Sequence, residues 1–183
     1  MPATFEWDRD HGAAAGSPAK GTTRDHNVGN VNWKNSDVEA TAYSAAPITA
    51  GQNSFDNWMS GHFSGSYNQI LNGRFAHTAG TFPTGCTLMG PPACTGDADR
   101  LLYTTPSTTT NANLTNNMTT AIAIGSGVTV CFGATGPEAT GKAASTTANP
   151  AFTNFLTTQL QTTSSAPAGD IPSITLSLQY DEN

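Results

Sequence analysis

Two similar triplets near the N-terminus hold the densest group of chemically capable side chains in the sequence. They read Arg9-Asp10-His11 and Arg24-Asp25-His26. Carboxylates and imidazoles are metal ligands, and arginine pairs with phosphate, so together the triplets are compatible with a metal or phosphate contact. Both lie in a polar stretch with isolated hydrophobic residues. We therefore interpret their similarity as a coincidence of composition.

Other histidine and aspartate residues are spread more widely. His62 and His77 would meet only if the segments that carry them formed a hairpin, and as histidines on a polar strand face they need no catalytic role. Asp97 and Asp99 have the spacing of paired carboxylates, which suits glycoside hydrolysis or calcium binding. No third acidic ligand lies nearby, so we interpret them as a solvated turn.

The segment Gly136 to Lys142, GPEATGK, matches the first seven positions of a phosphate-binding loop. Ala143 takes the place of the magnesium-binding hydroxyl, and Pro137 removes a backbone donor. The match is therefore interpreted as chance. No catalytic nucleophile motif occurs either. We expect a protein that is not an enzyme, with no catalytic residues, no cofactor and no metal.

Three cysteines, Cys86, Cys94 and Cys131, cannot all pair within one chain. Cys86 and Cys94 flank a Pro-Pro turn and are close enough in sequence for a small-loop disulfide. The alternative is free thiols in a reducing compartment, which we favour.

Charge and hydropathy exclude several classes of partner. The formal net charge is −6, and the seven basic residues are scattered singly, so no basic stripe predicts direct nucleic-acid binding. No run of eighteen apolar residues predicts a membrane span. The N-terminus lacks the charged and apolar regions of a secretory signal, so synthesis in a cytoplasm is expected.

The composition and its periodicity predict an all-β protein. Hydrophobic residues make up 37% and charged residues 11%, and Thr, Ser, Ala, Asn and Gly fill the balance, which suits strands joined by many turns. In the last strand Ile174, Leu176, Leu178 and Tyr180 alternate with polar residues. An antiparallel two-sheet sandwich, jelly-roll-like, is expected. Its eight strands are placed at about 55–64, 67–77, 86–89, 100–104, 121–124, 128–132, 152–163 and 173–180.

Residues 1–36 differ in texture from residues 37–183, which we assign to the β-sandwich domain. The first segment is charged, and its hydrophobic residues stand alone, among them Phe5, Trp7 and Trp33. A segment without a core of its own can bury such aromatics in a neighbour. We therefore expect an extended N-terminal arm, mobile in the free protein, with these three residues as partner-binding anchors.

Two stretches carry a resemblance to a known group. Residues 54–80 read SFDNWMSGHFSGSYNQILNGRFAHTAG, and the ending reads QLQTTSSAPAGD followed by ITLSLQYDE. Over residues 54 to 181 the chain resembles small β-rich virion structural proteins of tailed bacteriophages.

The resemblance implies a capsid cement or decoration protein. Such a protein binds the outer face of the major capsid protein shell, commonly as a homotrimer, and the virion is its expected location. A tail, neck or baseplate component shares the same sequence features. A carbohydrate-binding or receptor-binding sandwich is a further alternative, with Trp33, Trp58 and Tyr67 as stacking platforms, although aromatic residues at strand positions are more often core residues.

Overall fold

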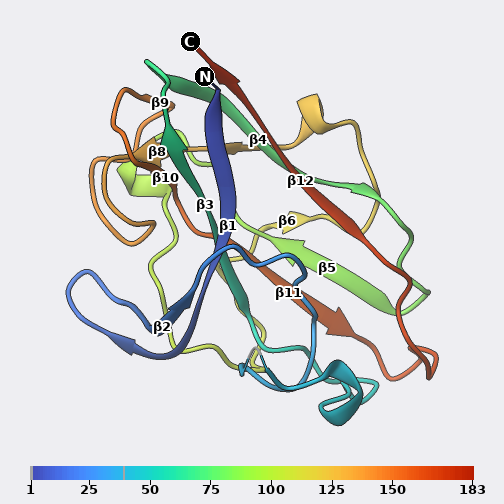
Figure 1. The fold of residues 1–183 in the computed structure, drawn as a ribbon. Coiled ribbons are helices and arrows are strands. Elements are labelled where there is room, and N and C mark those ends of the chain that lie inside the picture. Colours follow the sequence, from blue (N-terminus) through green and yellow to red (C-terminus); the bar gives the residue numbers. More distant parts are fainter. Residues whose placement is uncertain (1, 39) are drawn as a thin grey trace.

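The computed structural model describes residues 2–38 and 40–183, which form two antiparallel β-sheets (Figure 1). The strands of the larger sheet are β1 (Ala3–Ala15), β2 (Lys20–Asp25), β3 (Asn57–Gly65), β5 (Cys86–Gly90), β6 (Asn116–Asn117), β8 (Phe132–Gly133), β10 (Ala151–Thr153) and β11 (Leu156–Thr162). Its main path has the order β2-β1-β3-β11-β5-β6, and β10 pairs with both β3 and β8.

The smaller sheet has the order β12-β4-β7, and β9 also pairs with β4. Its strands are β4 (Ile70–Ala79), β7 (Val128–Val130), β9 (Ser145–Thr146) and β12 (Thr175–Glu182). The helical elements of the described residues are three short 3-10 turns, η1 (Tyr43–Ala45), η2 (Asp97–Asp99) and η3 (Ile124–Ser126). None of these is long and apolar enough to cross a membrane.

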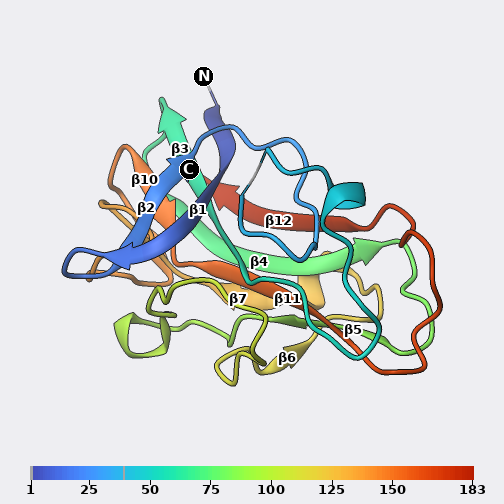
Figure 2. The same cartoon turned by 90° about the horizontal axis from the view of Figure 1, so that it is seen from below.

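The main hydrophobic core lies between the two sheets. Phe63, Leu88 and Leu160 contribute from the larger sheet, while Phe75 and Val130 contribute from the smaller one, and all five are buried. In Figure 2, β4 and β12 lie above β11 and β5. Burying one face of each sheet against the other removes these side chains from water. The expected all-β, two-sheet sandwich is confirmed.

The expected strands at 100–104 and 121–124 are wrong, because the first segment is a loop and the second is a loop that ends at the start of η3. Leu101 and Tyr103 are nevertheless buried, in a second hydrophobic cluster with Trp58 on the outer face of the larger sheet. Their alternation comes from packing against that face, and their backbone has no strand partner. The larger sheet is therefore covered on both faces over this region.

The N-terminal segment is not a separate arm. Strand β1 pairs with β3 from Ala3 to Asp10, which places it inside the larger sheet. Phe5 and Trp7 pack against the main core, because they alternate with polar residues along the strand. The expected division between residues 1–36 and the sandwich is therefore corrected: the sheet includes most of this segment. The sequence carries this alternation, with Phe5 and Trp7 between the polar residues Thr4, Glu6 and Asp8.

The cysteine pairing also differs from both expectations. Cys94 and Cys131 form a disulfide with their Cα atoms 5.5 Å apart, while Cys86 is a buried free thiol. The backbone N–H of Cys94 donates to the carbonyl of Thr129, which brings the loop after β5 beside β7. The prediction that all three thiols are free is wrong, and so is the Cys86–Cys94 alternative.

Candidate functional site

The outer face of β1 carries three acidic side chains in succession. Glu6, Asp8 and Asp10 alternate with the inward-facing residues of the same strand, because a β-strand turns successive side chains to opposite faces. Asp8 and Asp10 are buried, with 0% and 1% of their surface exposed. A row of carboxylates buried this deeply requires compensating partners.

The two Arg-Asp-His triplets meet across the β1–β2 hairpin. In the antiparallel register Arg9 lies opposite Asp25, and Asp10 lies opposite Arg24. The Arg24 guanidinium is 2.5 Å from Asp10, and His11 Nε2 is 3.1 Å from Asp25. The two triplets are therefore related through the structure. When one Arg-Asp pair lies antiparallel to a second Arg-Asp pair, each arginine stands opposite an aspartate.

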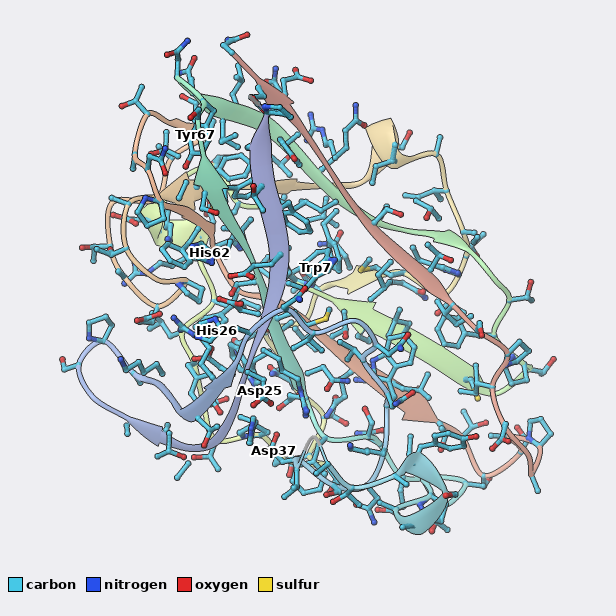
Figure 3. All side chains as sticks on the ribbon, viewed as in Figure 1. Trp7, Asp25, His26, Asp37, His62 and Tyr67 are labelled. Atoms are coloured by element: carbon cyan, nitrogen blue, oxygen red, sulfur yellow. A yellow bond between two sulfur atoms is a disulfide. The ribbon has the colours of Figure 1, made fainter. Side chains whose placement is uncertain are left out.

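Four side chains next to this pair form what we call the carboxylate–imidazole cluster: Glu6, Asp8, His26 and His62. Glu6 Oε1 lies 2.6 Å from His62 Nδ1, and Asp8 Oδ1 lies 3.0 Å from His26 Nδ1. His26 follows β2 and His62 belongs to β3, and both lie on the same side of β1 in Figure 3. The His62 ring stacks on Phe152 with a centroid distance of 4.5 Å, which fixes its plane.

Asp8 is the electrostatic centre of the cluster. Burial raises the pKa of its carboxyl, and the hydrogen bond and charge of His26 oppose that rise. Among the residues that the structure describes, Asp8 Oδ2 has no hydrogen-bond partner, and neither does the buried Oγ of Ser60, which lies opposite Asp8 in the β1–β3 register. Asp10, by contrast, is matched by Arg24, which also contacts Glu138 at 2.9 Å.

Within the part of the chain that the structure describes, one group of side chains has the arrangement needed to hold a metal ion. One ligand atom from each of Glu6, Asp8 and His26 lies within 4.8 Å of the others. Sequence reasoning expected no metal and missed the group, because its members come from positions 6, 8 and 26. Only the hairpin register, with Asp8 and His26 on one face, would have indicated it.

The expected anchors Phe5, Trp7 and Trp33 are directed into their own fold. The Phe5 ring lies 5.2 Å from that of Phe63, and the Trp33 indole donates to Thr158 Oγ1 at 3.2 Å. All three are half-buried against the main core. Their side chains are therefore not free to insert into a partner, as the arm hypothesis required.

The other candidate histidine and aspartate residues form hydrogen bonds with nearby backbone groups. His62 and His77 belong to different sheets, and both ring nitrogens of His77 lie 2.9 Å from backbone carbonyl oxygens. Asp97 accepts hydrogen bonds from the backbone N–H groups of Gly141 and Lys142, each at 2.8 Å. These backbone bonds hold the pKa of Asp97 below its usual value.

The lysine of the phosphate-loop-like segment points into the protein. Lys142 is buried, and its ammonium donates to the carbonyl of Thr135 at 2.8 Å. Burial lowers the pKa of Lys142 to about 8. Because its ammonium is buried and bonded to a backbone carbonyl, Lys142 does not present its charge to a bound phosphate.

An open groove of about 950 Å³ lies beside the main core. Its walls mix apolar residues such as Trp33, Ile48 and Ile174 with polar residues such as Asn32 and Thr49. Asp170 is the only charged residue among the described residues that line it. An acid–base pair of the kind that hydrolyses glycosides is therefore missing from these walls.

Comparisons with known proteins add no relative. No family model, no curated protein and no solved structure matches the chain. The function is therefore argued from the fold, the site and the sequence resemblance.

Proposed function

We propose that this chain is a non-enzymatic structural protein of a tailed-phage virion, of the capsid cement or decoration type. The two stretches that carry the resemblance support this proposal by their place in the fold. Residues 54–80 contain β3 and β4, and the closing stretch contains β12, which pairs with β4. The resemblance therefore covers strands that build both sheets.

The single observation that carries a contact function is the β1–β2 hairpin. Its two strands belong to the larger sheet, and its turn end projects beyond the other strands in both views (Figures 1 and 2). Strand β2 lies at the end of the larger sheet, and among the described residues its one strand partner is β1. Its Lys20, Thr22 and Thr23 are exposed. An open strand edge on a projecting hairpin can accept a strand or loop from a neighbouring protein.

The thiol chemistry supports a role without catalysis. Two of the three cysteines form the Cys94–Cys131 disulfide. Cys86 is buried and its pKa is raised by that burial, which keeps it as a thiol rather than the nucleophilic thiolate. We assign the chain to the outer capsid surface as a homotrimer that binds the major capsid protein.

The copy number of the chain in purified virions, relative to the major capsid protein, tests the proposal. A ratio of one or a simple fraction is expected, because cement sites follow the symmetry of the shell. A ratio of about a hundredth would move the chain to the tail or neck, on the same symmetry argument. Absence from virions would overturn the virion assignment.

A second experiment tests the hairpin edge. Thr22→Lys places a charge on the open edge, which opposes strand addition, whereas Thr120→Lys makes the same change at an exposed loop position. Co-sedimentation with purified shells is expected to fall for Thr22→Lys and to match the wild type for Thr120→Lys. Equal binding by both variants, with unchanged melting temperatures, would exclude the edge as the contact.

A further inference from the structure

We infer that Glu6, Asp8 and His26 form a binding site for a divalent transition-metal ion, with Zn²⁺ as the representative ligand. The site does not rest on the virion proposal. Two carboxylates and one imidazole offer the mixed oxygen and nitrogen donors that such ions accept.

The first argument is the charge balance of the outer face of β1. Asp10 is matched by the permanent charge of Arg24, at 2.5 Å. Among the described residues, the ion-pair partners of Glu6 and Asp8 are the imidazoles of His62 and His26, in contrast to the permanently charged Arg24 beside Asp10. A divalent ion would supply positive charge to these two adjacent carboxylates.

The second argument is the unused oxygen of Asp8. The side chain is 0% exposed, yet within the described residues neither its Oδ2 nor the neighbouring Ser60 Oγ has a hydrogen-bond partner. Leaving a buried carboxylate oxygen unpaired costs folding free energy. A bound cation would satisfy Asp8 and would stabilise the folded chain by mass action.

The third argument is that the ligands are both supported and accessible. His62 holds Glu6 at 2.6 Å and is itself held by stacking on Phe152, so it acts as a positioning residue that orients a ligand carboxylate. His26 is 62% exposed, and Glu6 is 33% exposed. The ion therefore enters from solvent between these two side chains, and water completes its coordination.

Calorimetric titration of the intact protein with Zn²⁺ tests the inference, together with the melting temperature at each Zn²⁺ concentration. We expect one ion per chain and a melting temperature that rises with Zn²⁺. His26→Gln and Asp8→Asn are expected to weaken binding by at least ~10-fold. His26 is largely exposed, so its variant keeps the test valid even if Asp8→Asn fails to fold.

His11→Gln is the matched control, because His11 also pairs with an aspartate of the same hairpin, at 3.1 Å, but lies outside the metal group. It is expected to bind Zn²⁺ like the wild type. The inference is overturned if the wild type shows no saturable binding, or if His11→Gln and His26→Gln lose affinity equally. Equal affinity for Ca²⁺ at the same residues would overturn the assignment to a transition metal.

Discussion

Asp56 gives the sharpest prediction about stability. It lies just before β3 with 3% of its surface exposed. Burial raises its pKa to about 6, against hydrogen bonds from the Asn111 side chain and the Ser107 backbone that lower it. Within the described residues, the buried Oδ1 of Asp56 has no hydrogen-bond partner.

The magnitude follows from proton linkage. The carboxyl of an aspartate in the unfolded chain has a pKa of 3.8, and in the folded state the pKa of Asp56 is about 6. Between these values the folded state holds a proton that the unfolded chain releases, so stability falls as the pH rises. The full penalty is about 3 kcal/mol above the folded-state pKa, at about 1.4 kcal/mol per pKa unit. About 2 kcal/mol of it develops between about pH 4 and about pH 7.5.

The assay is urea unfolding of the wild type and Asp56→Asn at these two pH values. The variant is expected to gain about 2 kcal/mol relative to the wild type as the pH rises. Any cost of burying the new amide N–H groups does not depend on pH and cancels in this difference. Asp170→Asn, at an exposed position, is the matched control and should show no such gain. A pH-independent difference between Asp56→Asn and the wild type would refute the reasoning.

Other predictions concern the N-terminal strand and the disulfide. Phe5→Ala is expected to lower the free energy of unfolding by about 3 kcal/mol, because Phe5 packs on the main core. Val38→Ala, at a position 54% exposed, is the control, and an unchanged melting temperature for Phe5→Ala would restore the arm hypothesis. Reduction of the Cys94–Cys131 bond, which links residues 37 apart, is expected to cost about 3–4 kcal/mol through unfolded-chain entropy. Urea unfolding with and without reductant measures it, and Cys86→Ser should lose the same amount on reduction if the assignment is right.

Local sequence patterns predicted the fold class well. The run of alternating residues from Ile174 to Tyr180 covers most of β12. The strand expected at 55–64 corresponds to β3. The wrong strand at 100–104 has a physical cause. Leu101 and Tyr103 alternate like a strand but lie in a loop on the outer face of the larger sheet. Alternating hydrophobic and polar residues indicate which side chains are buried. They do not indicate whether the backbone pairs with a neighbouring strand.

The candidate site was beyond the reach of sequence reasoning for a related reason. Asp8 and His26 belong to different segments of the hairpin, and their spacing in the sequence does not predict that they face each other. The triplets at 9–11 and 24–26 were visible, but their pairing depends on where the chain turns between them. The disulfide partner of Cys94 was hidden in the same way, because the loop after β5 returns beside β7.

The sequence by itself determined that the chain builds antiparallel sheets, because side-chain alternation is a local property of an extended backbone. Only the tertiary structure decided that β1 lies inside the larger sheet, that Cys94 bonds with Cys131, and that Glu6, Asp8 and His26 converge. These are contacts between distant segments, and their register is fixed by the packing of the whole core rather than by any one stretch of residues.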